Sequence, residues 1–273
     1  MKNNNIIVFL GGDIFGPVGM RCVSTLLGEL ITEEGVDFTV INGENATAGI
    51  GVAEADVRLI LAAGADVITG GNHSFEKRDF WPALDAFPEL LRPANYPEAV
   101  GRGAAIYEKN GRRFAVLNLQ GREDMPAIDC PFRSADAQLA EWAAADTAAG
   151  AETPYILVDF HAESNQEKEA LGLHLAGRVV SVTGTHTHVQ TADERIFPGG
   201  TAYMTDLGMT GPLRSVIGVD PEFAIKRNIT QVLYKMEAHN TRGALRGLLV
   251  EIDPETRKPV SVRRVEKTEP EAK

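Results

Sequence analysis

Side chains of the kinds that bind metals follow five predicted strands of this sequence, each at the point where the strand ends. They are carboxylates, carboxamides and imidazoles without a thiolate, a donor set that suits manganese, iron or zinc. In an open α/β sheet the carboxyl ends of the strands meet at one edge, so residues distant in sequence converge there. The residues are Asp13, Glu44, Asn45, Asn72, His161, His186 and His188.

The number and spacing of these seven residues fit a site for two metal ions. A dinuclear centre holds its ions about 3.5–4 Å apart and needs about seven or eight protein ligand atoms, with at least one bridging carboxylate. His186 and His188 are two residues apart, so in an extended segment both imidazoles point to the same side. The sequence therefore predicts a dinuclear metal site.

His73 follows Asn72 and is left over once the seven ligands are assigned. A spare histidine at a phosphate site is suited to donate a proton, because its ordinary pKa lies near neutrality.

Each of these candidate residues also has a simpler interpretation, since an Asp or Asn after a strand is usually a turn residue. His174 and His239 are interpreted as structural or exposed. The convergence of five strand ends, rather than any one residue, favours the metal site.

Strands and helices alternate along the chain and would position these residues. The pattern favours one α/β domain over residues 1–273. Strands are predicted at residues 6–10, 37–41, 65–69, 113–119, 155–160, 178–183 and 201–205. Helices are predicted from 17 to a stop at Gly35, at 53–63, at 134–149 with Ser134 as N-cap, and at 164–176 with a Ser164–Glu167 capping box.

The C-terminal part of the chain is predicted to be β-rich. Strands are expected at residues 232–239, 247–252 and 260–265. The charged residues 266–273 are expected to form a frayed tail.

The chain is acidic, with 27 Lys and Arg against 38 Asp and Glu among 273 residues, a net charge of −11. Such a chain repels long nucleic acids and anionic membranes, and no basic stripe offsets this. The sequence contains no dinucleotide-binding fingerprint, Walker loop or serine-hydrolase elbow. Cys22 and Cys130 have no metal or redox spacing. Without a recognisable signal peptide or membrane span, a cytoplasmic location is expected.

Several blocks of the sequence resemble the signature of calcineurin-like metallophosphoesterases: Gly12-Asp13, 42–45, 71–73 and 184–188. The finer detail is similar to one subfamily, the YmdB-like 2′,3′-cyclic-nucleotide 2′-phosphodiesterases. Its pattern matches residues 41–46, 92–97, 159–163 and the long run 184–211. The resemblance extends over residues 6–220, most of the chain.

This resemblance implies a four-layer α/β/β/α metallophosphoesterase sandwich, with two packed mixed sheets and two divalent metal ions at the strand ends. The family is associated with iron or manganese, and zinc is compatible with the same donors. By the resemblance, the first ion is held by Asp13, Glu44, Asn45 and His188. The second is held by Glu44, Asn72, His161 and His186, so that Glu44 bridges the two.

The implied activity is hydrolysis of 2′,3′-cyclic nucleotides to 3′-nucleotides by a metal-bridging hydroxide, with His73 as proton donor. Substrate-binding residues stay unassigned. The loops 92–97, 193–195 and 208–212 are candidates to shape a nucleotide pocket. Arg92 and Arg195, which lie on two of these loops, are candidates to contact a phosphate, although the role of an ordinary surface salt-bridge partner is slightly favoured for each.

Two alternative functions stay open. One is a broader phosphodiesterase, phosphatase or nuclease on the same metal core. The other is a regulatory protein that binds a nucleotide or a partner and turns over slowly. The expected partners are a small cyclic nucleotide or phosphodiester, an RNA-processing protein and further copies of the chain in a homo-oligomer, without a membrane.

Overall fold

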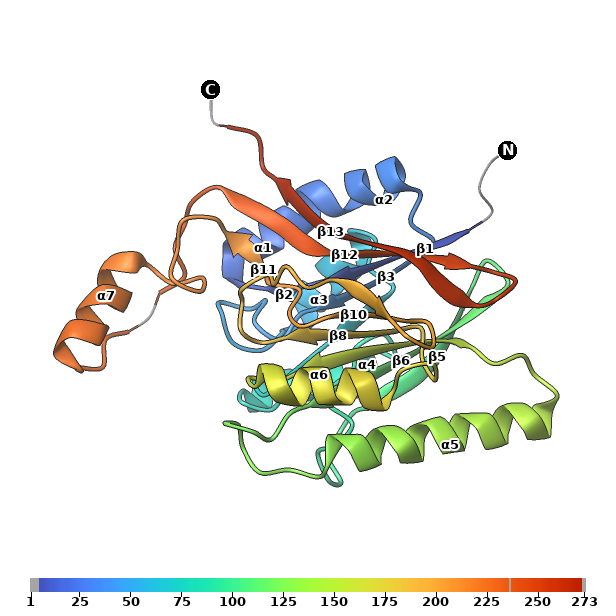
Figure 1. The fold of residues 1–273 in the computed structure, drawn as a ribbon. Coiled ribbons are helices and arrows are strands. Elements are labelled where there is room, and N and C mark those ends of the chain that lie inside the picture. The colour runs from blue at the N-terminus through green and yellow to red at the C-terminus, as the bar shows by residue number, and fades with distance from the viewer. Residues whose placement is uncertain (1–4, 236, 272–273) are drawn as a thin grey trace.

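Two β-sheets lie face to face at the centre of the molecule, with helices on both outer faces (Figure 1). The computed structural model describes residues 5–235 and 237–271. The first sheet has the order β2-β11-β12-β1-β3-β4, with β13 also paired to β12. Its strands are β1 (Ile6–Gly11), β2 (Asp13–Ile14), β3 (Phe38–Asn42), β4 (Val67–Thr69), β11 (Met209–Pro212), β12 (Gly243–Asp253) and β13 (Lys258–Thr268).

The second sheet has six strands in the order β5-β6-β7-β8-β10-β9. They are β5 (Ala104–Lys109), β6 (Arg112–Gln120), β7 (Tyr155–His161), β8 (Ser181–Thr185), β9 (Arg195–Phe197) and β10 (Thr201–Met204). Both sheets are mixed. In the first, β1, β3 and β4 are parallel neighbours, and in the second β6, β7 and β8 are. The carboxyl ends of the parallel strands carry the loops described below.

Helices follow most of the parallel strands. They are α1 (Gly16–Cys22), α2 (Gly28–Glu34), α3 (Glu54–Ala62), α4 (Trp81–Ala86), α5 (Pro131–Ala149), α6 (Asn165–His174) and α7 (Pro221–Thr230). A π-helical turn (Val23–Leu27) joins α1 to α2, and a 3₁₀ turn (Arg78–Phe80) precedes α4. Within the part of the chain described, every helix is too short or too polar to cross a bilayer.

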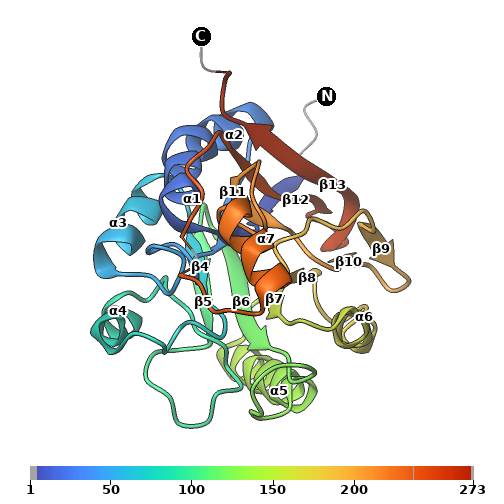
Figure 2. The same ribbon diagram turned by 90° about the vertical axis from the view of Figure 1, so that its left-hand side faces the viewer.

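Three apolar clusters separate four layers of secondary structure. Strand β7 shows the principle, because its side chains alternate between the two faces of the second sheet. Tyr155 and Leu157 point into the cluster between the sheets, whereas Ile156, Val158 and Phe160 point into the cluster under α5 and α6. A third cluster lies between the first sheet and α1–α3. The predicted α/β/β/α arrangement with two packed mixed sheets is confirmed, and Figure 2 shows α3 and α5 on opposite sides of it.

The first predicted helix and the cap of α6 are confirmed. Gly35 ends α2 in the left-handed conformation, with φ of 68°. The Ser164 side chain accepts a hydrogen bond from the backbone N–H of Glu167. The Glu167 carboxylate, however, reaches the backbone N–H groups of Arg122 and Glu123 on the loop after β6. This side chain therefore connects α6 to the second sheet.

Two expectations about other elements are wrong, and one helix was missed. Helix α5 begins at Pro131 with Cys130 as N-cap, rather than at Ser134, because a proline in the first turn already has the helical φ. Residues 232–239 form no strand in the part that the structure describes; Ala238 makes a single β-bridge with Val219, and Val232 and Leu233 are exposed instead of paired in a sheet. Helix α7, just before them, was not expected at all.

The expected fraying of the tail is wrong for its first residues. Strand β13 continues to Thr268, where it pairs with Ala244 of β12. Glu269 then forms an ion pair of 2.6 Å with Arg21 on α1. The two-stranded ladder with β12 holds this charged segment, because ladder hydrogen bonds do not depend on apolar side chains.

We expect Phe114→Ala to destabilise the protein through the contact between the sheets. Phe38 of the first sheet and Phe114 of the second stack at 4.2 Å between ring centroids, and both are buried. Removing a buried phenyl ring leaves a cavity, which lowers the free energy of unfolding by about 3–5 kcal/mol. Urea unfolding measures this change in the free energy of unfolding. Val260→Ala, at a 51% exposed position of β13, should change it by less than about 0.5 kcal/mol. Equal effects of the two changes would contradict this account of the core.

Candidate metal centre

His161 is the centre of a cluster of ligand-type atoms from both sheets. It ends β7 and is completely buried. Its Nε2 atom lies 3.0 Å from Glu44 Oε1, 3.0 Å from Asn72 Oδ1 and 3.0 Å from His186 Nδ1. Ligand atoms of Glu44, His161 and His186 all lie within 4.8 Å of one another. Several lone pairs directed at one small volume form an arrangement that a cation would stabilise.

Asp13, Asn45 and His188 extend this cluster on the side of the first sheet. Asn45 Nδ2 donates to Glu44 Oε1 at 3.0 Å and lies 3.3 Å from Nε2 of His188. Asp13 Oδ2 accepts the backbone N–H of His186 at 3.1 Å. Asp13 Oδ1 is buried and has no hydrogen-bond partner among the described residues. A buried carboxylate oxygen without a partner is costly, so its position beside these donors fits a cation ligand. The structure thus brings together all seven predicted residues.

The ring nitrogen of His161 that does not face the cluster is also held. This Nδ1 atom lies 3.0 Å from the hydroxyl of Thr185, and that hydroxyl donates to Asp159 at 2.8 Å. A histidine that binds a metal usually has its second nitrogen bonded in this way, which fixes the ring and its tautomer. Nε2 of His161 is therefore the nitrogen available for a metal ion.

His186 and His188 show the same division between their two nitrogens. Nε2 of His186 lies 3.1 Å from the Glu163 carboxylate, and Nδ1 faces His161. Nδ1 of His188 donates to the backbone carbonyl of Ile217 at 2.8 Å, and Nε2 faces Asn45. In both residues the outer nitrogen has an acceptor and the inner nitrogen points into the cluster, as expected of metal ligands.

The segment that carries these two histidines is not extended, contrary to the expectation. His186 and His188 have positive φ angles of 102° and 65°. The buried Asp206 carboxylate holds the segment, since it accepts both the N–H and the hydroxyl of Thr187, at 3.0 and 2.8 Å. Lys168 balances the charge of Asp206 through a buried ion pair of 2.7 Å. The two imidazoles therefore face the cluster because of the loop conformation, not because of strand alternation.

His73 lies at the edge of the cluster and is partly exposed, with 30% of its side chain accessible. Its backbone N–H donates to Glu44 Oε2 at 3.2 Å. Its Nδ1 atom is paired with the carboxylate of Glu76. Its Nε2 atom has no hydrogen bond to any residue in the described part of the chain. This imidazole is accessible beside the cluster, the place that a proton donor needs.

Burial and mutual interaction shift the pKa values of the clustered groups. Burial raises the pKa of Asp13 to about 6. Burial acts in the same direction on Glu44, but the charge and hydrogen bond of His161 outweigh it and lower the Glu44 pKa to about 2. Burial opposes protonation of His161, yet Glu44 and Asp13 raise its pKa to about 9. Burial and the charge of His161 lower the pKa of His186 to about 3. In the metal-free protein a proton therefore occupies His161.

The other side chains considered from the sequence have structural roles. The buried guanidinium of Arg92 donates to backbone carbonyls of its own loop, including those of Pro93 and Ala99. Arg195 pairs with Glu169 and lies over an aromatic ring. Cys22 is buried, and burial raises its pKa to about 12, so it is no nucleophile.

The remaining histidines are also structural, as expected. His174 pairs with Asp136 at 3.0 Å, and His239 pairs with Asp220 at 2.9 Å. Neither pair involves a residue of the cluster.

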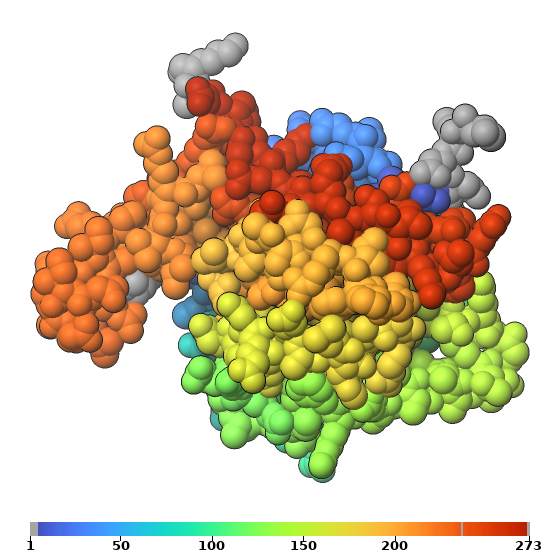
Figure 3. Space-filling view, viewed as in Figure 1, coloured from blue at the N-terminus to red at the C-terminus, as the bar shows by residue number. Residues whose placement is uncertain are grey.

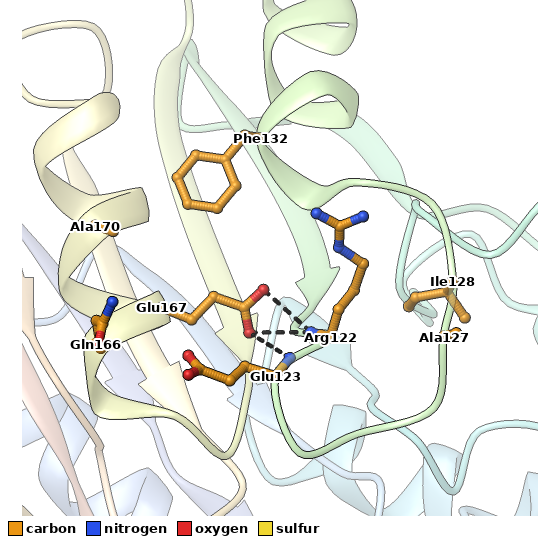
Figure 4. Close-up of a pocket in the computed structure, with 8 residues that line it drawn as sticks. All are labelled: Arg122, Glu123, Ala127, Ile128, Phe132, Gln166, Glu167 and Ala170. Atoms are coloured by element: carbon orange, nitrogen blue, oxygen red, sulfur yellow. Dashed lines mark hydrogen bonds between the residues drawn. The ribbon is translucent and has the colours of Figure 1, made fainter.

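A surface pocket of about 490 Å³ lies between α5, α6 and the loop after β6. Figure 4 shows Phe132 and Ala170 on its helical side and the Arg122 side chain opposite, with the Glu167 carboxylate on the loop N–H groups between them. None of the seven clustered residues lines it. The pocket is therefore separate from the candidate centre.

Sequence reasoning missed the residues that support the cluster. Glu76 lies three residues after His73, and Glu163 two residues after His161, so local spacing gave a signal for both. Asp206 and the carbonyl of Ile217 gave none, because their contacts are formed only by the folded chain.

Known proteins resemble this chain along nearly its whole length. The family model of "YmdB-like protein" matches residues 9–265. A Bacillus subtilis protein named 2′,3′-cyclic-nucleotide 2′-phosphodiesterase is 44% identical over 95% of this chain and 96% of its own length. The crystal structure of a hypothetical protein from Thermus thermophilus aligns with a TM-score of 0.88 at 33% identity, over 97% of this chain and 100% of that one. A structure from Mycoplasma pneumoniae, described as a novel phosphatase, has a TM-score of 0.88 at 30% identity, over 97% and 94%.

The shifted pKa of His161 predicts that metal binding releases a proton. A metal ligand must be a neutral imidazole, whereas the raised pKa of about 9 keeps His161 protonated at pH 7. We therefore expect about one proton released per chain at pH 7, and an apparent affinity that rises with pH up to about 9. Below the Asp13 pKa of about 6, that carboxyl group is also protonated, so metal binding should release a second proton.

Titration calorimetry of Mn²⁺ binding, in two buffers of different ionisation enthalpy, measures the protons released. His174→Ala, which lies outside the cluster, should give the same result as the unchanged protein. An affinity independent of pH between about 6 and 9 would contradict the prediction.

Proposed function

We propose that this chain, which belongs to the YmdB-like family, is a metal-dependent phosphodiesterase that hydrolyses 2′,3′-cyclic nucleotides to 3′-nucleotides. The observation that carries the proposal is the position of His161 Nε2, 3.0 Å from ligand atoms of three other residues. The name of the Bacillus subtilis relative supports the substrate, since it is 44% identical over 95% of this chain.

The seven clustered residues would hold two divalent ions, with Glu44 shared. One ion would take Asp13, Asn45 and His188 in addition to Glu44. The other would take Asn72, His161 and His186. When bound, such ions would supply positive charge for the phosphate oxygens and would lower the pKa of a water molecule at the site. The donor set of nitrogen and oxygen fits iron, manganese or zinc, and the family resemblance favours iron or manganese.

His73 donates the proton that the leaving group needs. In the reaction a water molecule gives up one proton to the solvent and its oxygen forms a bond to phosphorus. The bond from phosphorus to the ribose 2′ oxygen breaks, and that oxygen takes a proton from Nε2 of His73. The phosphate then remains on the 3′ oxygen. Glu76 holds Nδ1 of the same ring, so the proton leaves from the nitrogen on the open side of the cluster.

A phosphatase acting on monoesters at the same centre is the second candidate. It is favoured by the description of the Mycoplasma pneumoniae structure as a novel phosphatase. The relative rates on a cyclic diester and a monoester separate the two. A regulatory role and an RNA-processing partner stay predictions.

We expect the purified protein to contain two divalent ions per chain and to convert 2′,3′-cyclic AMP into 3′-AMP. Metal analysis and chromatographic identification of the product measure both. Glu44→Gln removes the shared negative charge with little change of shape, and should lose most of the metal and the activity. A 2′-AMP product, or full occupancy of both sites in Glu44→Gln, would overturn the proposal.

We expect His73→Ala to lower kcat for 2′,3′-cyclic AMP by about 10²–10⁴-fold without loss of metal, because it removes only the proton donor. The loss should be much smaller for a p-nitrophenyl diester, whose leaving group needs no proton. His174→Ala serves as the matched control, since this histidine pairs with Asp136 outside the cluster. An equal loss on both substrates would contradict the role of His73 as an acid.

A further inference from the structure

The loop 92–97 is fixed beside the candidate metal centre by Asn95. The buried side chain of Asn95 donates to the carbonyl of Gln120 at 2.8 Å and accepts the N–H of Gln120 at 2.9 Å. Gln120 ends β6, and its partner in the parallel ladder is His161 of β7. Tyr96, the next residue of the loop, is therefore held one strand away from the residue at the centre of the cluster.

The other two loops that the sequence suggests for a nucleotide pocket have structural roles. The Asp193 carboxylate accepts the hydroxyl groups of Thr191 and Thr205, at 2.6 and 2.5 Å. Residues Met209–Pro212 form β11 within the first sheet. Loop 92–97 is the one of the three that contains an aromatic residue.

Gln120 holds the Tyr96 side chain and is left with an unmet hydrogen bond. Its Oε1 atom accepts the Tyr96 hydroxyl at 3.0 Å, whereas its Nε2 atom is buried without an acceptor among the described residues. Residues paired in parallel strands direct their side chains to one face, so this amide lies on the same face as the His161 ring. Four buried side-chain atoms in the described part of the chain lack a partner, and a second one at this centre is Asp13 Oδ1. Because unmet polar atoms are costly, two of them at one place mark it as built for a polar ligand.

Tyr96 and Phe75 form an aromatic surface close to His73. Phe75 lies two residues after His73, and its ring centroid is 5.0 Å from that of Tyr96, at an angle of 57°. Both aromatic residues are partly exposed. The indole N–H of Trp81 donates to the Phe75 carbonyl at 3.0 Å, and the two rings meet edge-on at 6.2 Å. Phe75 is therefore fixed in position next to the residue proposed as proton donor.

This surface suits a nucleobase better than a second anion. The rings of Tyr96 and Phe75 are uncharged, and the Glu44 carboxylate is near enough to add to the rise that burial causes in the pKa of Tyr96. Every base has an aromatic face, so stacking on an aromatic side chain needs no charged partner. An acidic protein can therefore bind the base of a nucleotide in this way.

Helix α7 leaves an approach to this place. The segment that contains α7 begins at the candidate centre, where the Ile217 carbonyl accepts the N–H of His188. The helix itself stands away from the body of the molecule in the space-filling view (Figure 3). A small ligand can therefore approach the strand ends beside it.

We propose that the rings of Tyr96 and Phe75 form the nucleobase subsite of the candidate centre, with the base stacked on Tyr96 and the phosphate at the metal ligands. One ribose separates the base of a nucleotide from its phosphate, and one strand spacing of about 4.8 Å separates Gln120 from His161. Gln120 is a positioning residue, since it holds the Tyr96 hydroxyl. This inference rests on the proposed function, because it assigns another part of the same substrate.

Steady-state kinetics on two substrates tests the subsite. Tyr96→Leu keeps an apolar side chain but removes the ring, so it should raise KM for 2′,3′-cyclic AMP about ten-fold and leave kcat almost unchanged. Glycerol 1,2-cyclic phosphate has the same five-membered cyclic diester without a base, so its KM should stay the same. Tyr96→Phe keeps the ring and loses one hydrogen bond, and it should change KM by less than about three-fold on either substrate.

Binding of the product measures the same contact without turnover. Calorimetry of the Mn²⁺-loaded protein should show that Tyr96→Leu binds 3′-AMP about ten-fold more weakly and binds inorganic phosphate equally well. The matched control is Tyr107→Leu, because Tyr107 is also partly exposed and its hydroxyl donates to the Pro88 carbonyl at 2.8 Å. This control should leave all these values unchanged. Circular dichroism and Mn²⁺ titration establish that each variant is folded and binds metal.

An equal rise of KM on both substrates in Tyr96→Leu would overturn the subsite, since the change would then act on the centre itself. So would an unchanged KM for 2′,3′-cyclic AMP. A Tyr96→Phe variant as impaired as Tyr96→Leu would also count against stacking, because the hydroxyl rather than the ring would then matter. If the unchanged protein hydrolyses neither substrate, the proposed function is refuted instead, and the binding of 3′-AMP still tests the subsite.

Discussion

The candidate site exists only because two different sheets end at the same place. Glu44 and Asn72 follow strands of the first sheet, whereas His161 and His186 belong to the second, yet their ligand atoms surround one small volume. Asp159 of β7 connects the two sheets beneath this volume. Its buried carboxylate accepts Asn42 of the first sheet at 3.1 Å and Thr185 of the second at 2.8 Å.

Burying the carboxylate of Asp159 between the sheets costs free energy. Burial raises the pKa of Asp159, so its charged form is stable only while the hydrogen bonds from both sheets are made. The backbone of the loop after β4 must also come very close to the cluster. A Cβ at Gly71 would lie 2.1 Å from Glu44 and 2.3 Å from His161, so only glycine lets this loop pass beside the cluster. Any shift of one sheet against the other would therefore separate the ligands and leave a buried carboxylate without its partners.

The ligand-type residues could be predicted from the sequence because they are local events. A strand appears in the sequence as a short apolar run, and the polar residue that ends it comes next along the chain, as with His161 at the end of β7. The supporting contacts are not local. Asp206 reaches Thr187 across 19 positions, and Ile217 reaches His188 through its backbone, which has no side-chain signature. The strand predicted at residues 232–239 was wrong for a related reason. The pattern of apolar residues shows which side chains are apolar, but it does not show which part of the folded chain covers them.

The charges of the site require that metal ions bind before an anionic substrate does. The seven clustered residues include two carboxylates, while the carboxamides and neutral imidazoles add no charge, and the whole chain is at −11. A phosphodiester anion would therefore find little attraction in the metal-free site, where even the proton on His161 is already shared with Glu44. Two divalent ions would change the local balance to about +2, since ions are the largest charges in such a site. In the proposed reaction the positive charge that attracts the substrate would then come from the ions rather than from Lys or Arg. An acidic surface would in that case repel long polyanions and still admit one small diester.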